Sequence, residues 1–234
     1  MKFNCLLVGE SGAGKTPLAA TLAECKETAP CLFLDVDRGS LSIISNPRPT
    51  IFEINSWDQV RQIYVMLRDR KWVELAELTN SEPQEYLSLV IDSGTELEYV
   101  LRKSVVVANE HGDKEVPSQP DYLKTQERFR SLYRALRDLP LSVVMTAGIR
   151  DLKDDVVGMV KFFPAFQPGL TRDLVRMTDL VLFMDVRMEE KKWIRCLQTH
   201  ASQRIIARDR SQKLDPVIKG DKMYFKDIVA RMMK

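Results

Sequence analysis

The chain has 234 residues, of which 44% are hydrophobic and 29% are charged, and its formal net charge is only +2. These values exclude an intrinsically disordered chain and a polycation that would bind nucleic acid through charge alone. No run approaches eighteen apolar residues and the first ten residues do not have the pattern of a signal peptide, so we expect a cytoplasmic protein without a membrane span.

Apolar runs of strand length alternate with longer amphipathic stretches, which predicts an α/β fold with helices on both faces of a mostly parallel sheet. The expected strands are Phe3–Val8, Cys31–Leu34, Thr50–Ile54, Leu87–Ile91, Leu141–Thr146, Leu180–Asp185, Trp193–Gln198 and Arg204–Ala207. The expected helices are Pro17–Cys25, Ser56–Arg70 (which opens on a Ser-x-x-Gln capping box), Gly94–Asn109, Tyr122–Leu139, Pro168–Met177 and Phe225–Met233.

Two polar stretches interrupt this alternation. Asn109–Asp121 contains a glycine, two prolines and several charges, and is expected to form a loop. Arg150–Pro168 is longer than a routine connection, and long ordered loops are often functional. The four cysteines lack the C-x-x-C spacing and are expected to be reduced core thiols, while His111 and His200 are too far apart in the sequence to suggest a metal cluster.

The residues Gly9-Glu10-Ser11-Gly12-Ala13-Gly14-Lys15-Thr16 match the phosphate-binding pattern G-x-x-x-x-G-K-[ST] in full. Glycines let the backbone turn tightly, so that N–H groups and the N-terminus of the following helix face a phosphate. Lys15 is expected to bridge the β- and γ-phosphates of ATP, and the Thr16 hydroxyl to bind Mg²⁺. The pattern arises by chance in roughly 1 of 100 chains of this size. Its position between an apolar strand and a helix-forming run favours ATP binding over a glycine-rich turn without a ligand.

Acidic residues end two of the expected strands. Asp92 follows an apolar run and is predicted to hold Mg²⁺ beside the glycine loop, with capping of the next helix as the alternative. Hydrolysis of the γ-phosphate also needs a group that orients water, for which Asp37 is the candidate and Asp35 and Glu96 are alternatives. The polar end of another strand makes Thr146 a candidate γ-phosphate sensor.

Together these motifs resemble the RecA-like P-loop ATPases, in particular the compact phage group that includes single-strand annealing recombinases. GESGAGKT resembles the Walker A loop, EYLSLVIDSGTEL the Walker B strand, and CLFLDVDRGSL the strand whose end carries a catalytic glutamate, here Asp37. Because aspartate has the shorter side chain, slow hydrolysis is expected. The resemblance implies one RecA-like domain, with a nucleotide-binding core at 1–184 and a basic, strand-rich extension at 185–234 that carries a net charge of +6.

The segment Arg204-Ile-Ile-Ala-Arg208-Asp-Arg210 is similar to the K-x-R stretch of bacterial RadA and its phage relatives. The resemblance implies that Arg208 and Arg210 reach the phosphates of a neighbouring subunit as arginine fingers, with ATP bound at the interfaces of a ring or filament. A basic edge strand that faces solvent is the alternative.

The stretch Arg150–Pro168 stands where RecA-like proteins place loops that contact DNA, after the strand beside Walker B. Basic side chains there could neutralise backbone phosphates and aromatic rings could stack on bases, although a phenylalanine pair is as often part of the core. The candidate DNA contacts are Arg150, Lys153, Lys161, Phe162, Phe163 and the weaker Arg172.

Three functions remain open at this level. The leading hypothesis is a phage-encoded, oligomeric ATPase that binds single-stranded DNA and promotes annealing or recombination in a bacterial host, with a single-strand-binding or replication protein as a further partner. The second is a helicase loader or protein-remodelling switch without recombinase activity. The third is a nucleotide kinase, which is disfavoured because the lids of such kinases are rich in arginine and Asn109–Asp121 has none.

Overall fold

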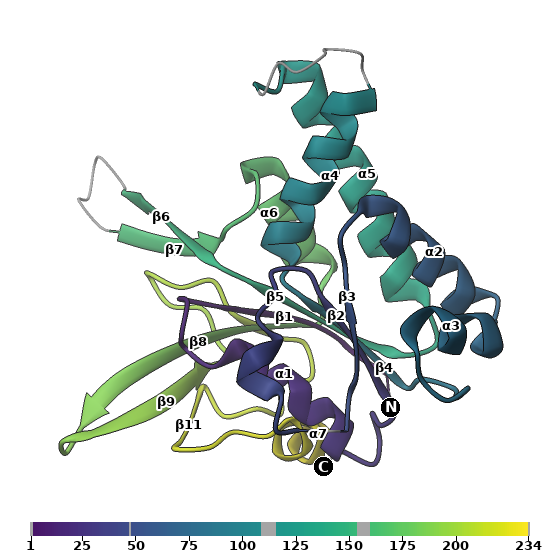
Figure 1. The fold of residues 1–234 in the computed structure, drawn as a ribbon. Coiled ribbons are helices and arrows are strands. Elements are labelled where there is room, and N and C mark those ends of the chain that lie inside the picture. Colours follow the sequence, from purple (N-terminus) through teal and green to yellow (C-terminus); the bar gives the residue numbers. More distant parts are fainter. Residues whose placement is uncertain (1, 47, 109–115, 154–159, 234) are drawn as a thin grey trace.

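The structure, a computed structural model, describes residues 2–46, 48–108, 116–153 and 160–233. Nine strands of these residues form one sheet in the order β11-β9-β8-β1-β5-β4-β2-β3, with β10 paired to β8 (Figure 1). The strands are β1 (Asn4–Gly9), β2 (Cys31–Asp35), β3 (Thr50–Glu53), β4 (Ser88–Asp92), β5 (Ser142–Ala147), β8 (Leu180–Glu189), β9 (Lys192–Gln198), β10 (Arg208–Asp209) and β11 (Val217–Gly220).

The sheet is parallel from β3 to β8, and antiparallel where β9, β10 and β11 join it. The glycine loop follows β1 and Asp92 ends β4, and β5 lies between these two strands. The carboxyl ends of parallel strands meet at one edge of a sheet, where α/β proteins bind their ligands. The predicted mostly parallel sheet with a strand-rich C-terminal extension is therefore confirmed.

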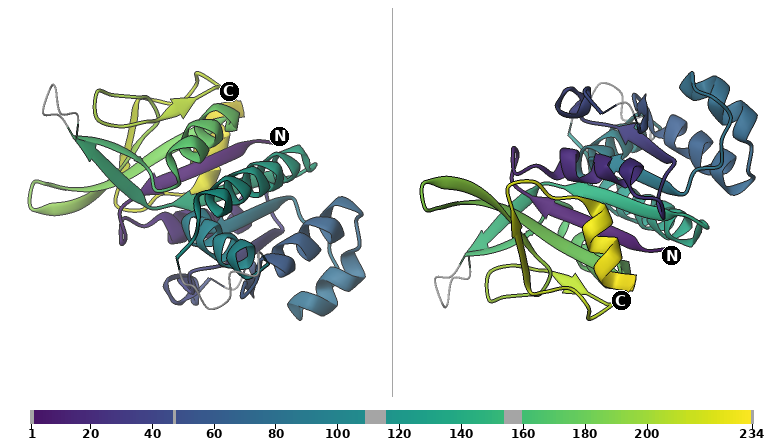
Figure 2. Two further views of the ribbon diagram at one scale, coloured as in Figure 1. Left: turned by 90° about the horizontal axis from the view of Figure 1, so that it is seen from above. Right: turned by 90° about the horizontal axis from the view of Figure 1, so that it is seen from below.

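Two layers of helices cover the sheet, because strand side chains alternate between its faces. In β1, Leu6 and Val8 belong to one hydrophobic cluster, and Cys5 and Leu7 to the other. Figures 1 and 2 show the larger layer on one face and α1 with α7 on the other. The first layer comprises α2 (Trp57–Arg68), α3 (Trp72–Thr79), α4 (Gly94–Ala108), α5 (Gln119–Asp138) and α6 (Pro168–Met177); the second comprises α1 (Lys15–Ala20), α7 (Phe225–Met233) and the 3₁₀ turns η1 (Thr21–Glu24) and η2 (Ser40–Ile43).

The predicted capping box at the start of α2 is confirmed. Ser56 Oγ accepts a hydrogen bond from the Gln59 N–H at 3.3 Å, and Gln59 Oε1 accepts one from the Ser56 N–H at 3.2 Å. Two backbone donors that a helix cannot satisfy internally are thereby paired. The apolar face that follows, with Val60, Ile63 and Leu67, is buried in the core.

Two assignments made from sequence need correction. The predicted strand Arg204–Ala207 is wrong. Ile205 forms only an isolated bridge with Phe162, and the strand that pairs with β8 is β10, which consists of Arg208 and Asp209. The stretch Arg150–Pro168 is not one long loop, because β6 (Ile149–Lys153) and β7 (Val160–Pro164) form an antiparallel hairpin. The helix α3 and the strand β11 were missed, since segments of eight and four residues carry too little periodicity to be recognised.

Three further features of the sequence can be compared with the structure: the cysteines, the loop that contains His111, and the length of the helices. Cys5, Cys25, Cys31 and Cys196 are buried and free, as expected of core thiols. Residues 109–115 of the predicted loop, His111 among them, lie outside the described residues. Among the residues that the structure describes, no helix is both long and apolar enough to span a bilayer.

Candidate nucleotide-binding site

The glycine loop links the end of β1 at Gly9 to the start of α1 at Lys15. Gly12 and Gly14 adopt φ angles of 78° and 103°, in the left-handed region that other residues rarely occupy. Gly14 is the residue that precedes the first turn of α1. The turn therefore places the open N-terminus of α1 at the carboxyl edge of the sheet, where its free N–H groups can bind an anion.

Lys15 folds over this loop. Its Nζ donates hydrogen bonds to the carbonyl oxygens of Gly9 at 2.9 Å and Glu10 at 2.8 Å. Burial lowers the pKa of Lys15, and the negative charges of Asp92, Asp37 and Glu10 oppose that shift. Among the residues that the structure describes, the ammonium group has backbone acceptors and no salt bridge, so it can turn to a phosphate without breaking an ion pair.

Asp92 is buried at the end of β4 and accepts two hydroxyl hydrogen bonds. Thr16 Oγ1 donates to Asp92 Oδ2 at 2.5 Å, and Thr146 Oγ1 donates to Asp92 Oδ1. Burial raises the pKa of Asp92, and the nearby carboxylates of other aspartates add to the shift while both hydroxyls oppose it. The alternative that Asp92 caps α4 does not fit, because Ser93 Oγ accepts the hydrogen bond from the Glu96 N–H.

The pair formed by Thr16 and Asp92 fits a magnesium ion by its donor chemistry. Mg²⁺ prefers hard oxygen ligands and usually takes one or two from the protein, with phosphate oxygens and water completing the shell. Hydroxyl and carboxylate oxygens lie side by side here, next to the phosphate loop. Within the described residues, no cluster of three or more histidine, cysteine or acidic side chains could hold a metal by itself.

The structure separates Asp35, the last residue of β2, from Asp37, which lies two residues beyond the strand. Asp35 is fully buried, and its carboxylate accepts hydrogen bonds from the Gly39 and Ser40 N–H groups, each at 3.0 Å. Asp37 is exposed; a Cβ atom on Gly39 would lie 2.9 Å from Asp37 Oδ1 and 3.8 Å from Asp92 Oδ2. Asp35 thus shapes the turn, whereas Asp37 stands near Asp92 where a water could be oriented. Glu96 lies half-buried in the first turn of α4.

A cavity of about 400 Å³ opens beside the glycine loop. One wall is the outer side of α1 with η1, the second is η2, and the third comes from β8, β9 and the turn before α7. Its lining includes Gly14, Pro17, Leu18, Thr21, Glu24, Ile43, Asn46, Met184, Arg195, Asp221, Met223 and Tyr224. The sequence motifs did not reveal Arg195 or Tyr224, since neither stands in a recognisable pattern.

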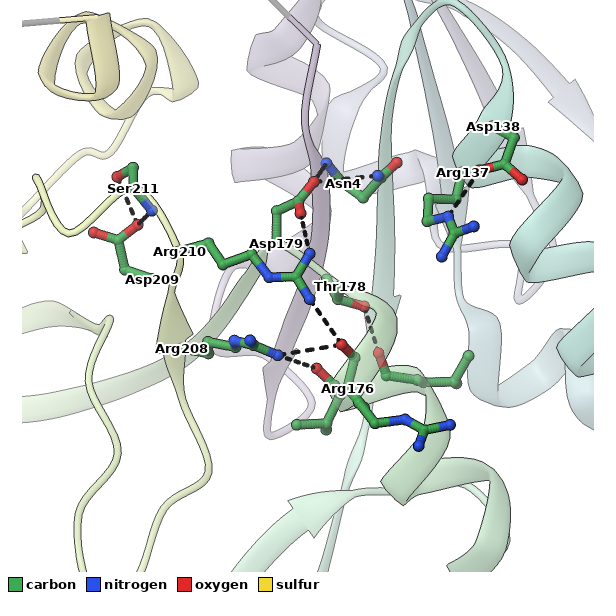
Figure 3. Close-up of polar contacts among 12 residues, drawn as sticks. Asn4, Arg137, Asp138, Arg176, Thr178, Asp179, Arg208, Asp209, Arg210 and Ser211 are labelled. Carbon is green, nitrogen blue, oxygen red and sulfur yellow. Dashed lines mark hydrogen bonds and ion pairs between the residues drawn. The ribbon is translucent and has the colours of Figure 1, made fainter.

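Arg208 and Arg210 lie near Asp179 and near Asn4 at the start of β1, away from the end of β1 that carries the glycine loop. Figure 3 shows their polar contacts. Arg210 Nη1 donates to Asp179 Oδ1 at 2.8 Å, and Asp179 Oδ2 accepts from the N–H of Asn4, the first residue of β1. Both guanidinium groups also donate to the carbonyl oxygen of Arg176, in the last turn of α6. Within one chain these arginines stabilise the end of a helix and lie far from the glycine loop.

A family model described as an AAA domain matches residues 1–211, which includes the glycine loop, Asp92 and both arginines. The chain belongs to this family and is a P-loop ATPase. The comparison with curated protein sequences gives no significant match. Among solved structures, a KaiC-like protein from the hyperthermophilic archaeon Pyrococcus horikoshii is similar, with 15% identity, a TM-score of 0.43, and coverage of 84% of this chain and 77% of that one. So distant a likeness transfers no residue role or partner.

The candidate DNA contacts on and beside the β6–β7 hairpin of this ATPase differ in how far they are exposed to solvent. Lys161 is exposed, while Arg150 is half-buried with its guanidinium 6.0 Å from the centre of the Phe163 ring. Phe162 packs on Phe183 in the core at 6.2 Å between ring centres, which takes its ring away from a base. Lys153 ends β6, and Arg172 is exposed on α6. The exposed charged side chains of this hairpin therefore include acidic Asp151 as well as Lys161, while the two phenylalanines are half-buried.

Proposed function

We propose that this ATPase works as a head-to-tail oligomer that uses Mg·ATP, binds single-stranded DNA, and promotes annealing or recombination. The observation that carries the proposal is the position of two half-sites at opposite ends of one sheet. The glycine loop with Asp92 lies at the carboxyl edge, and Arg208 with Arg210 lies at the amino edge. A second copy is needed to bring these halves together.

The separation of the two half-sites follows from the length of β1. Arg210 is tied through Asp179 to Asn4 at the start of β1, and the glycine loop begins at Gly9. Six residues of β-strand span about 17 Å from first to last, which exceeds the reach of an arginine side chain. In a head-to-tail assembly the amino edge of one subunit faces the carboxyl edge of the next, and Arg208 and Arg210 can contact the neighbour's γ-phosphate.

ATP would then act as an assembly switch. In one chain the two guanidinium groups are held by a carboxylate and by backbone carbonyl oxygens. A γ-phosphate is a stronger, bidentate partner for arginine, so ATP favours the interface, and its hydrolysis weakens it. Mg²⁺ held by Thr16 and Asp92 would neutralise charge on the phosphates, and Asp37 would orient the attacking water.

A mixing experiment tests the shared site. Arg210→Ala alone is expected to lower ATP turnover about 1000-fold, as for other arginine fingers. In an equal mixture of Arg210→Ala and Lys15→Ala subunits, the first kind keeps an intact glycine loop and the second keeps an intact arginine. With random assembly, one interface in four joins these two intact parts, so about a quarter of wild-type turnover should return. Arg137→Ala, which removes an arginine paired with Asp138, is the control and should retain activity. A mixture that stays inactive would contradict catalysis in trans.

DNA binding is tested by titrating single-stranded DNA at several salt concentrations and by following phosphate release. We expect affinity that falls as salt rises, and faster ATP turnover with DNA present. Lys161→Gln should lower the slope of log affinity against log salt by about 1, while Arg61→Gln on α2, remote from the hairpin, should leave it unchanged. If DNA neither binds nor stimulates turnover, the ATPase recognises a protein instead, as a helicase loader or remodelling switch does.

The proposal extends to the cellular setting. A recombinase of the phage group acts in the cytoplasm of a bacterial host, where single-strand-binding and replication proteins share its substrate. A pull-down of such proteins, run with and without DNA, distinguishes direct partners from proteins that are bridged by DNA.

A further inference from the structure

Arg195, in β9, lies directly over the glycine loop. A Cβ atom placed on Gly14 would come within 2.8 Å of Arg195 Nε and 3.2 Å of Met184 Cε. The left-handed φ of 103° favours glycine at this position, and a Cβ atom there would also displace the Arg195 side chain. A residue late in the chain therefore forms part of the surface of the phosphate loop.

The charge of Arg195 is not neutralised by a neighbouring acid. Its Nη1 donates to the backbone carbonyl oxygen of Asp221 at 2.7 Å, and it forms no salt bridge with any carboxylate in the described part of the chain. The adjacent cations behave differently: Arg187 pairs with Asp185 at 2.9 Å, and Lys219 pairs with Glu189 at 2.7 Å. A half-buried guanidinium that lacks a counter-ion beside an anion-binding loop is suited to bind an anion.

The same side chain borders the cavity of about 400 Å³ that begins at the glycine loop. Lys15 and Thr16 are the proposed partners of the β- and γ-phosphates, and the cavity beside α1 has room for the nucleoside. The wall of the cavity is apolar at Pro17, Ile43 and Tyr224. Arg195 stands where the loop meets the cavity, which is between the β-phosphate and the nucleoside.

We infer that Arg195 binds the α-phosphate of the nucleotide held by its own chain, and that the cavity behind it takes the nucleoside against Tyr224. The inference rests on the proposed binding of ATP. The family model ends at residue 211, and one wall of this cavity is formed by the later residues Asp221 to Tyr224. This wall is therefore a feature of the present chain that the family match does not cover. Through its hydrogen bond to Asp221, Arg195 also links bound nucleotide to the segment that leads into α7.

Calorimetric titrations of ATP and ADP into the full chain test the inference. Arg195→Gln should lower the affinity for ATP and for ADP by the same factor, about tenfold or more. Both nucleotides have the α-phosphate, and the variant loses a charged hydrogen bond to it. Arg195→Lys keeps the positive charge without the guanidinium fork, so its loss of nucleotide affinity should be smaller. Arg187→Gln is the matched control on the neighbouring strand and should bind as wild type does. Thermal unfolding without nucleotide checks that each variant is folded.

Each contrary result has one meaning. Equal affinity of wild type and Arg195→Gln overturns the inference, and so does a loss confined to ATP, which would place the guanidinium at the γ-phosphate. An equal loss in Arg187→Gln would reveal a general charge effect and also overturns it. A wild-type chain that binds neither nucleotide overturns the proposed function as well, so the two failures are distinguishable.

Discussion

Replacement of Lys15 by alanine is expected to lower ATP turnover by about 100-fold or more, as removal of one preorganised charge from a reacting phosphate does. The fold should persist, because in the described part of the chain Nζ bonds to just the carbonyl oxygens of Gly9 and Glu10, and α1 is held by the burial of Leu18, Ala19 and Ala20. Alanine also favours the helix. Phosphate release and ATP titration give the functional result, and circular dichroism reports the fold.

Lys26→Ala is the matched control for this variant. Lys26 is exposed just beyond η1 and outside the glycine loop, so its removal should change neither affinity nor turnover. If Lys15→Ala binds ATP as tightly as wild type, the loop does not serve as a phosphate site, and the functional reading of the carboxyl edge must be abandoned. If both lysine variants lose affinity equally, the cause is overall charge.

Replacement of Asp92 by asparagine should have opposite effects on activity and on stability. Turnover should fall by about 100-fold or more, because an amide is a poor ligand for Mg²⁺. The nucleotide-free protein should become more stable at neutral pH, since a charge is removed from a buried position. Asparagine can still accept a hydrogen bond from one threonine hydroxyl and donate to the other, so the contacts of Thr16 and Thr146 have replacements.

The pH dependence of this stability difference has a definite sign. The pKa of Asp92 is raised in the folded protein above its unfolded value of about 3.9. The stabilising proton is therefore bound in wild type below pH about 4 and is lost as pH rises through the folded pKa. Chemical unfolding of both proteins without Mg²⁺ should give equal free energies at acidic pH and a growing advantage for Asp92→Asn toward pH 7. A difference that stays constant over this pH range would show that folding does not raise the pKa of Asp92.

Features that depend on a local residue pattern can be predicted from the sequence. The glycine loop, the capping box of α2 and most strands could be predicted because each requires a short run of particular residues. The family resemblance was predictable for the same reason, since the motifs follow one another in a characteristic order. Strand positions could not be predicted where only two residues pair, as in β10, or where the alternation of apolar and polar residues is weak, as in β6 and β7.

The contacts between polar residues that are distant in sequence follow from how the strands pair. The sequence favours Asp37 over Asp35 but leaves Asp35 as an alternative; the turn after β2 buries Asp35 under backbone donors and leaves Asp37 near Asp92. Pairing of β10 with β8 puts Arg210 at the amino edge, away from its own glycine loop, and pairing of β9 with β8 carries Arg195 onto that loop. Such contacts join segments far apart in sequence, so strand order and register set them, and no local pattern encodes either.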